Sequence, residues 1–154
     1  MATRMISVAL GSILAAGSSL PAPADEGPRI AVAQDRRLGS FLTDGSGNSL
    51  YIFSSDMQGT ADTSPQVSCA NTCLEIWPPY LVLEAPTAEE GVDKSLIGTT
   101  ELNGRLMATY NGWPLYTYIA DTDPGDIAGH GNRSFVGLWT PVSPEGKPVP
   151  VLRE

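Results

Sequence analysis

The sequence predicts a mainly β domain with few short helices, in which two hairpin-centred repeats pack as one pseudo-twofold unit. The first supporting observation is an internal repeat. Gly39–Asp56 and Gly104–Asp121 align without a gap at a shift of 65 residues, with five of eighteen positions identical. A self-similar period of this kind marks duplicated units that bury a shared face. The second is composition, because 16 glycines and 13 prolines favour turns and short strands over long helices.

Length and charge limit the organisation and the partners of the chain. With 154 residues it is too short for more than one ordinary domain. Seventeen acidic and nine basic residues give a formal net charge of −8. This acidic balance argues against binding to nucleic acid or to anionic membranes. We therefore expect the partner to be a small ligand or a component of the cell envelope.

The first 24 residues are interpreted as a secretory signal peptide. Arg4 supplies the positive start, Ile6–Ala16 is an apolar stretch broken only by small residues, and residues 22–24 read Ala-Pro-Ala before a cut at Asp25. The stretch is too short and too weakly apolar for a membrane span. No cysteine lies near the cut, so we expect no lipid anchor. The sequence thus predicts an exported protein, either periplasmic or extracellular.

The mature chain is divided into a leader and one domain. Residues 25–37 are rich in polar residues and follow a Pro/Ala-rich stretch, and they are interpreted as a leader or tether. A single repeat-built domain is expected over residues 38–154. Repeat one covers about 38–85 and repeat two about 100–146.

Each repeat is predicted to contain a β-hairpin. In repeat one two strands flank the Asp44–Gly47 turn cluster, and in repeat two they flank Asn111-Gly112. Asn-Gly between apolar runs is the strongest short-range hairpin signal, because both residues tolerate positive φ. The second strands are expected at Leu50–Phe53 and Leu115–Ile119.

Apolar residues on both faces of these second strands predict burial on both sides. The aromatic face comprises Tyr51 and Phe53 in repeat one, and Tyr116 and Tyr118 in repeat two. The aliphatic face comprises Leu50 and Ile52 in repeat one, and Leu115 and Ile119 in repeat two. We expect the aromatic residues to pair with each other across the pseudo-twofold axis.

The only two cysteines, Cys69 and Cys73, precede Trp77 in a short helix predicted over about 70–77 and stopped by prolines. In an exported protein an even pair is most simply a disulfide. Residues i and i+4 of a helix lie about 6 Å apart, so a slightly irregular turn is needed. The alternative is a copper or redox site with His130, the only histidine, because thiolates suit Cu(I). The spacing does not fit Cys-x-x-Cys redox motifs, which favours the disulfide.

Three aspartates, Asp121, Asp123 and Asp126, lie within six residues. Such a density of carboxylates suits a hard cation such as Ca²⁺, although the EF-hand pattern is not followed. A turn in which aspartates accept hydrogen bonds from backbone amides is favoured. We expect no metal, and these aspartates and His130 are only weak candidate ligands.

Asp56 and Asp121 are equivalent positions at the ends of the second strands. They could form a catalytic carboxylate pair, or each could hold a loop through backbone amides. The sequence shows no nucleophile motif and no Gly-rich phosphate loop, and His130 lies between two glycines as a loop residue would. We expect no enzymatic activity and no cofactor.

Further aromatic residues lie near prolines and glycines, where binding clefts often form. Tyr110 and Trp113 flank the Asn111-Gly112 turn and are candidates for such a binding surface. Trp77 and Trp139 are interpreted as packing residues.

The combined pattern resembles a known bacterial family. Leu-Tyr-x-aromatic-x-x-Asp occurs twice; a close Cys pair and Trp-Pro-Pro follow the first copy, and Pro-Gly-Asp follows the second. The pattern resembles the bacterial secreted-repeat family of predicted lipoproteins, with its Tyr-x-(Phe/Trp/Tyr)-x-x-Asp motif, over about 38–146. The motif residues are Tyr51, Phe53, Asp56, Tyr116, Tyr118 and Asp121. The resemblance implies an exported repeat-built domain and no particular activity, because the function of the family is unsettled. Many relatives carry a lipid-bearing cysteine that this chain lacks.

From these observations we predict an exported, non-enzymatic module of the periplasm or cell envelope, with a structural or binding role. One alternative is a metal (copper) or redox accessory protein that uses Cys69, Cys73 and His130. A second alternative is a small enzyme that uses Asp56 and Asp121.

Overall fold

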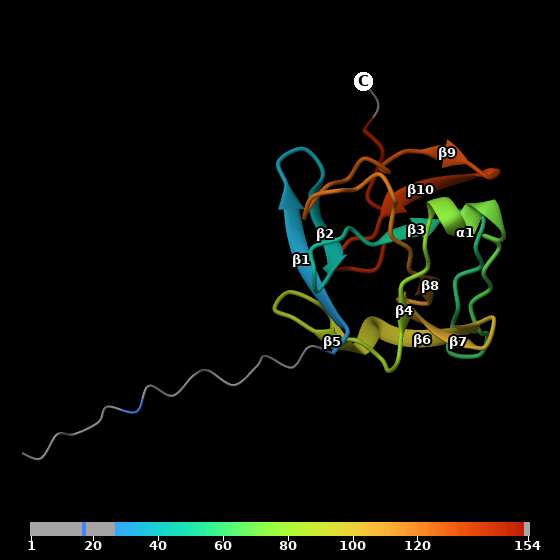
Figure 1. The fold of residues 1–154 in the computed structure, drawn as a ribbon, viewed down its shortest axis with the longest axis horizontal. Helices are drawn as coiled ribbons and strands as arrows, with labels where there is room; N and C mark the ends of the chain where they lie inside the picture. Colours follow the sequence, from blue (N-terminus) through green and yellow to red (C-terminus); the bar gives the residue numbers. More distant parts are fainter. Residues whose placement is uncertain (1–16, 18–26, 153–154) are drawn as a thin grey trace, which may run out of the picture.

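The computed structural model describes residue 17 and residues 27–152, so the predicted signal peptide lies almost entirely outside the described residues. The described chain forms short strands with one helix and one 3₁₀ turn (Figure 1). The strands are β1 (Arg29–Asp35), β2 (Gly39–Asp44), β3 (Tyr51–Phe53), β4 (Leu81–Val82), β5 (Thr87–Ala88), β6 (Ile97–Leu102), β7 (Arg105–Tyr110), β8 (Trp113–Pro114), β9 (Arg133–Ser134) and β10 (Gly137–Pro141). The helix is α1 (Thr72–Ile76), and the 3₁₀ turn is η1 (Lys94–Leu96). The predicted mainly β class with few short helices is confirmed.

The strands form three small sheets. Their orders are β2-β1-β5, β3-β10-β9 and β4-β7-β6, and β8 pairs with β7. Figure 1 shows the β1–β2 hairpin at the left, β6 and β7 at the lower right, and β9 and β10 at the upper right. No helix in the described part of the chain has the length and apolarity that a membrane crossing requires.

The start of the domain differs from the prediction. Residues 25–37 are predicted from the sequence to be a leader. In the structure Arg29–Asp35 forms β1, which pairs antiparallel with β2. The charged residues that suggested a tether make the turn between these strands. There the Asp35 carboxylate accepts hydrogen bonds from the backbone amides of Arg37 and Leu38, at 2.8 and 3.0 Å. The antiparallel β6–β7 pair is the corresponding hairpin of repeat two.

The Asn111-Gly112 hairpin is confirmed. Both residues have positive φ, at 50° and 77°, and Tyr110 pairs with Trp113 across the turn. Two positive φ values are the signature of a type I′ turn, whose twist matches that of the flanking strands. A side chain at Gly112 would collide with the Gly59 carbonyl, because the loop of repeat one lies directly on this turn.

The hairpin predicted for repeat one forms only in part. Next to the turn its arms are joined by the antiparallel bridge between Thr43 and Ser49 and by the hydrogen bond from the Leu50 N–H to the Leu42 carbonyl at 2.9 Å, but β3 itself pairs with β10. The connection is longer than a two-residue turn. It is closed by the Asp44 carboxylate, which accepts hydrogen bonds from the amides of Ser46 and Asn48.

The strand predicted at Leu115–Ile119 is also wrong, because only bridges form there. The backbone of this segment bonds to several separate stretches of chain: Tyr116 pairs with Tyr51, the Thr117 N–H donates to the Pro78 carbonyl, and the Leu115 N–H donates to the Ala108 carbonyl. Proline has no N–H to donate, so a continuous ladder cannot form beside Pro78 and its neighbour Pro79. Ile119, predicted to be buried, is 58% exposed.

Two clusters of buried side chains form the core. The aliphatic cluster contains Ile30, Leu42, Leu50, Ile52, Ala108, Tyr110, Leu115 and Val142. The aromatic cluster contains Tyr51, Phe53, Cys69, Cys73, Trp77, Met107, Tyr116 and Trp139. Leu50 and Ile52 thus lie in one cluster and Tyr51 and Phe53 in the other, as the predicted alternation of the strand faces requires.

Candidate functional site

The motif tyrosines join the two repeats through their backbones. The Tyr51 N–H donates to the Tyr116 carbonyl at 2.8 Å, and the Tyr116 N–H donates to the Tyr51 carbonyl at 3.0 Å. Both side chains are fully buried. The two residues therefore form a closely hydrogen-bonded antiparallel pair at the junction of the repeats.

The hydroxyl group of each motif tyrosine donates a hydrogen bond to the other repeat. Tyr51 Oη donates to Asp121 Oδ2 at 2.7 Å, and Tyr116 Oη donates to Asp56 Oδ2 at 2.7 Å. Each motif aspartate is therefore bound by the motif tyrosine of the other repeat. Hydrogen bonds to a carboxylate are stronger than those between neutral groups. The exchange fastens the repeats to each other with polar contacts inside the aromatic core.

The second oxygen of each carboxylate holds the loop of its own repeat. Asp56 Oδ1 accepts from the backbone N–H and the hydroxyl of Ser68, at 2.7 and 2.8 Å. Asp121 Oδ1 accepts from the backbone N–H of Ala128 at 2.8 Å. Each aspartate thus connects three segments: its own motif segment, its own loop and the tyrosine of the other repeat.

Burial changes the acidity of these groups. Withdrawal from water raises the pKa of Asp56, and the hydrogen bonds from Ser68 and Tyr116 oppose this shift only in part. The same cause raises the pKa of Asp121. Burial, together with the neighbouring carboxylate, also raises the pKa of Tyr51 and Tyr116. Both phenols therefore stay protonated at neutral pH and act as hydrogen-bond donors.

Four aromatic rings form a continuous stack across the junction. Phe53 stacks on Trp139 at 4.2 Å, Trp139 on Trp77 at 4.0 Å, and Trp77 on Tyr118 at 4.1 Å between ring centroids. The interplanar angles are 10°, 0° and 21°. Each motif aromatic therefore stacks on the tryptophan of the other repeat. The interpretation of the two tryptophans as packing residues is in keeping with their complete burial.

The tyrosine edges complete this arrangement. Tyr51 meets Trp77 edge-on at 5.3 Å, and Tyr116 meets Trp139 edge-on at 5.0 Å. Such T-shaped pairs are a preferred aromatic geometry. The expected pairing of motif aromatics across the junction is found between Tyr51 and Tyr118, which meet edge-on at 6.3 Å. Phe53 and Tyr116 contact Trp139 instead. Superposition of the two repeats onto a pseudo-twofold axis stays a prediction.

Cys69 and Cys73 are joined in a disulfide beside this stack, with their Cα atoms 5.4 Å apart. Asn71, between them, has φ of 54° and supplies the irregular turn that the sequence analysis required. The helix is shorter than predicted, because it begins at Thr72 and ends at Ile76. Both sulfur atoms are occupied by the bridge, so neither is a thiolate ligand in this state.

The acidic segment of repeat two forms turns. Asp126 accepts hydrogen bonds from the backbone amides of Asp123 and Thr122, which lower its pKa. The Asp121 carboxylate faces Tyr51 and Ala128 instead. Among the described residues, no group of three or more His, Cys, Asp or Glu side chains is arranged to hold a metal ion.

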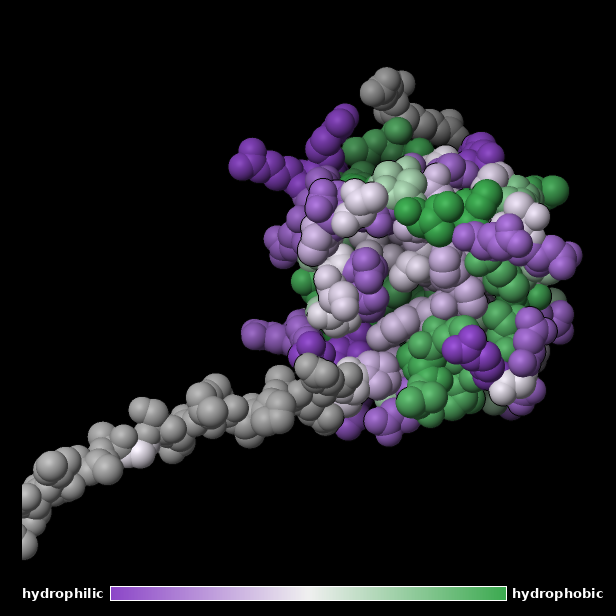
Figure 2. Space-filling view, viewed as in Figure 1, coloured by the Kyte–Doolittle hydropathy of each residue, from purple (hydrophilic) through white to green (hydrophobic). Residues whose placement is uncertain are grey.

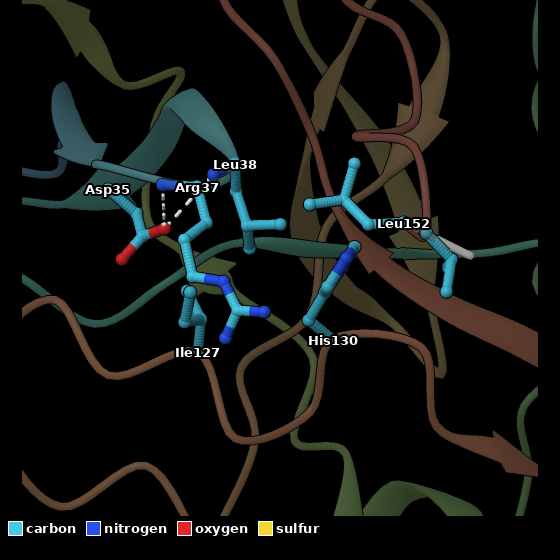
Figure 3. A pocket seen from close by; sticks show the side chains of 7 residues that line it. Asp35, Arg37, Leu38, Ile127, His130 and Leu152 are labelled. Carbon is cyan, nitrogen blue, oxygen red and sulfur yellow. Dashed lines mark hydrogen bonds between the residues drawn. The ribbon is translucent and has the colours of Figure 1, made fainter. Parts of the chain in front are cut away.

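His130 lines a hollow of about 350 Å³ that also contacts Ile127, the residue after the acidic turns. The hollow is bordered by Asp35, Arg37, Leu38, Ile127, His130, Val151 and Leu152. Figure 3 shows Arg37 and Leu38, from the turn between β1 and β2, and His130, from the loop before β9, directed into the same space. Burial lowers the pKa of His130, so the imidazole is neutral at neutral pH. The cysteines contribute nothing to this hollow.

Tyr110 does not line a surface, which corrects the prediction. Its ring is fully buried. Its hydroxyl donates to the Pro144 carbonyl at 2.7 Å and accepts from the Asp93 N–H at 3.0 Å. The loop of repeat one lies against the Asn-Gly turn beside it, and the hollow between them is lined by Thr109, Asn111 and Gly112 but not by Tyr110. Trp113 is half-buried against the aliphatic cluster.

One candidate feature was missed in the sequence analysis. The turn between β9 and β10 consists of Phe135 and Val136, which have φ of 52° and 65°. Such values are uncommon outside glycine and are true outliers for a β-branched residue. Val136 is 99% exposed and Phe135 38% exposed. Only the following Gly137 could have suggested a turn here, because phenylalanine and valine normally predict a strand.

The comparison with known families bears on the second repeat. Residues 99–143 match the family described as "Secreted repeat of unknown function". The match extends from β6 to the end of β10 and contains Tyr116, Tyr118 and Asp121. It confirms the resemblance inferred from the motifs and supports export of the protein. No curated protein and no solved structure matches the chain.

Proposed function

We propose that the protein is an exported, non-enzymatic binding module of the cell envelope, in which the fused repeats present the β9–β10 turn to a partner. The proposal is carried by the exposed apolar turn Phe135-Val136. Non-glycine residues held at positive φ cost on the order of 1–3 kcal/mol each. Such strain is typical of positions that are retained for function rather than for stability.

The turn is held rigidly by repeat one. Ser55 Oγ donates to the Val136 carbonyl at 2.9 Å, and Ser54 Oγ accepts from the Leu138 N–H at 2.8 Å. The Ser54 N–H donates to the Leu138 carbonyl at 3.0 Å. A braced turn loses little conformational freedom when a partner binds, which favours affinity. The exposed valine side chain would contribute apolar contact area to that complex.

Other exposed apolar residues are scattered over the molecule. Figure 2 shows apolar patches separated by polar residues on one face. The exposed large apolar residues outside the turn are Met57, Leu83, Leu106, Ile119, Val151 and Leu152. Single exposed apolar side chains are normal on protein surfaces. The β9–β10 turn differs from them because exposure is combined with backbone strain.

The candidate catalytic and metal-binding side chains support a non-enzymatic role. Asp56 and Asp121 each spend both oxygens on hydrogen bonds that hold the fold. A base in catalysis must lie within hydrogen-bond reach of a substrate proton, and both carboxylates are directed at tyrosine hydroxyls and loop groups of the protein itself. The disulfide occupies the two cysteines on which the copper alternative depends. These contacts favour a binding role over both alternatives.

The proposal is tested by replacing the turn with one that fits its backbone. The double substitution Phe135→Asn/Val136→Gly provides the Asn-Gly pair that type I′ turns prefer. We expect the free energy of unfolding to rise by about 1–3 kcal/mol, chiefly because glycine removes the strain at position 136. Retention of the exported protein in the envelope fraction of its host should fall at the same time. Urea denaturation and quantitative blotting of the fractions measure the two effects.

Leu83→Asn is the matched control, because Leu83 is 97% exposed and does not have a positive φ. It should leave envelope retention unchanged. If the turn variant is retained as well as the wild type, the turn is not the contact. If the wild-type protein itself is recovered free of the envelope fraction, the binding role is wrong.

A further inference from the structure

The aromatic stack contains two kinds of oxidisable side chain in different environments. The stack runs Phe53, Trp139, Trp77, Tyr118, with successive ring centroids 4.0 to 4.2 Å apart. Tyr51 and Tyr116 touch the two tryptophans with their edges. Rings in van der Waals contact couple electronically, so an electron vacancy on one ring can move to the next. The radical becomes localised on the ring that can lose a proton when it is oxidised.

The two tryptophans have no nearby group in the described part of the chain that could accept the indole proton after oxidation. The indole Nε1–H groups of Trp77 and Trp139 are buried and have no hydrogen-bond acceptor among the described residues. An oxidised tryptophan is a strong acid at this N–H, and without an acceptor it remains a radical cation. Such a cation in a buried apolar cluster is unfavourable. It therefore tends to take an electron from a neighbouring ring.

The two motif tyrosines do have a base. Tyr51 Oη and Tyr116 Oη each lie 2.7 Å from a carboxylate oxygen, of Asp121 and Asp56 respectively. Burial raises the pKa of both carboxyl groups, which makes the carboxylates better proton acceptors than an exposed aspartate. Loss of an electron from the phenol can thus be coupled to transfer of its proton over a single hydrogen bond.

From this geometry we infer that the junction of the repeats is a redox relay, which takes up a single oxidising equivalent from a one-electron oxidant outside the molecule and stores it on Tyr51 or Tyr116. Tyr118 is the entry, because it is the half-buried end of the stack. This role is independent of the proposed binding function, since it uses none of the residues of the β9–β10 turn.

The electron and proton balance is simple. The oxidant gains one electron from Tyr118 and is reduced by one unit, and Tyr118 then regains an electron from Trp77, which it contacts. Trp77 gains an electron either from Tyr51 or from Trp139, and in the second case Trp139 gains one from Tyr116. The O–H bond of Tyr51 or Tyr116 breaks, its proton forms a bond to Oδ2 of Asp121 or Asp56, and a neutral tyrosyl radical remains. The sum is one reduced oxidant, one tyrosyl radical and one protonated carboxyl group.

Two other tyrosines, the buried Tyr110 and the half-buried Tyr80, provide the contrast within the same chain. Tyr110 Oη donates to the Pro144 carbonyl at 2.7 Å, and Tyr80 Oη donates to the Arg29 carbonyl at 3.0 Å. A peptide carbonyl accepts a hydrogen bond but is far too weak a base to keep the proton. Neither ring belongs to the aromatic stack. These tyrosines should not hold the radical.

The test is photochemical oxidation of the mature protein by ruthenium(III) tris-bipyridine generated with a laser flash. Transient absorption distinguishes tryptophanyl from tyrosyl radicals, and electron paramagnetic resonance of frozen samples identifies the tyrosyl. In the wild type we expect a tryptophanyl signal that decays into a tyrosyl signal. That step should be slower in D₂O, because a proton moves with the electron. The isotope effect needs no variant and is therefore free of folding defects.

Variants locate the radical. In Tyr51→Phe/Tyr116→Phe the tyrosyl signal should be lost, and in Asp56→Asn/Asp121→Asn its rate of formation should fall about a hundredfold, the usual contribution of a positioned base. Tyr80→Phe/Tyr110→Phe is the matched control and should resemble the wild type. Near-ultraviolet circular dichroism verifies that each variant retains the packed aromatic core.

Three outcomes would overturn the inference. The tryptophanyl radical of the wild type could decay without forming tyrosyl. The tyrosyl yield could be the same in Tyr51→Phe/Tyr116→Phe as in the wild type, which would place the radical elsewhere. The control pair Tyr80→Phe/Tyr110→Phe could lose as much signal as the motif pair, which would show that no particular tyrosine is selected.

Discussion

The two repeats make the same contacts at their junction but reach them through different loops. In repeat one, Asp56 is followed by a loop that contains a disulfide and α1 before Trp77. In repeat two, Asp121 is followed by turns and by the β9–β10 hairpin before Trp139. In both repeats the tryptophan after the loop lies in the same stack. In both repeats a backbone N–H of the loop also donates a hydrogen bond to the motif aspartate. The residues at the junction are matched, and the connections between them are not.

The difference also determines what each repeat exposes. The loop of repeat one is closed covalently, and its aspartate is only 6% exposed. Repeat two has no such bridge, its aspartate is partly exposed, and its hairpin presents the strained turn. Repeat one thus acts mainly as support, since Ser54 and Ser55 brace that turn. The comparison suggests a division of labour between similar halves.

The largest loss in the free energy of unfolding is expected when a motif tyrosine is removed. Tyr51→Ala or Tyr116→Ala deletes a fully buried ring, its contact with tryptophan and its hydrogen bond to the other repeat. Large-to-small changes of this kind cost about 3–5 kcal/mol. Urea denaturation measures the loss, and the half-buried Tyr118→Ala should cost less. A near-wild-type unfolding curve for either variant would mean that the repeats are not fastened here.

A smaller effect, unequal between the repeats, is expected from the aspartates. Asp56→Ala leaves the Tyr116 hydroxyl and the Ser68 amide without an acceptor, and buried unsatisfied groups cost about 1–3 kcal/mol. Asp121→Ala should cost less, because water can reach that site more easily. The two free energies of unfolding are compared under the same conditions. Equal losses would show that burial does not distinguish the repeats.

The disulfide should matter only for repeat one. Cys69→Ala/Cys73→Ala removes a short covalent loop, which contributes about 2 kcal/mol in the chain-entropy model. Hydrogen exchange of the double variant should show faster opening of the amides around α1 than of those around β9 and β10. Uniformly faster exchange in both repeats would contradict separate roles for their loops.

The smallest effect is a difference in pH dependence between two aspartates of the same loop. The lowered pKa of Asp126 gives a stabilising contribution that is present above the usual aspartate pKa and lost as pH falls. The raised pKa of Asp121 has the opposite sign, with a contribution that is present at low pH and lost as pH rises. The test is to measure free energies of unfolding between about pH 3 and pH 7, where carboxyl groups titrate.

The two substitutions should therefore diverge with pH. The advantage of the wild type over Asp126→Asn should grow as pH rises, and its advantage over Asp121→Asn should shrink. Parallel curves for the two variants would indicate that the loop environments are alike.

Much of the core could be predicted from local pattern. The alternation in Leu50–Phe53 determined which residues enter which cluster, because successive side chains of a strand point to opposite faces. Asn111-Gly112 formed its turn because both residues accept positive φ. The disulfide followed from an even cysteine pair in an exported chain.

Other features depended on partners far away in the sequence. β1 was mistaken for a leader because its neighbour β5 and its place in a sheet cannot be read from its own residues. Leu115–Ile119 has strand composition but lies beside prolines that cannot donate to a ladder. Tyr110 looked like a surface aromatic because the segments that cover it come from residues 93 and 144.

The sequence by itself determined the mainly β class and the secreted-repeat motif, because alternation, turn chemistry and motif spacing are local properties. Only the tertiary structure decided that each tyrosine binds the aspartate of the other repeat, and that two tryptophans 62 positions apart stack at the centre. The physical reason is that a repeated motif specifies equal units but not the contacts exchanged between them. Those contacts arise when the units bury their aromatic faces against each other.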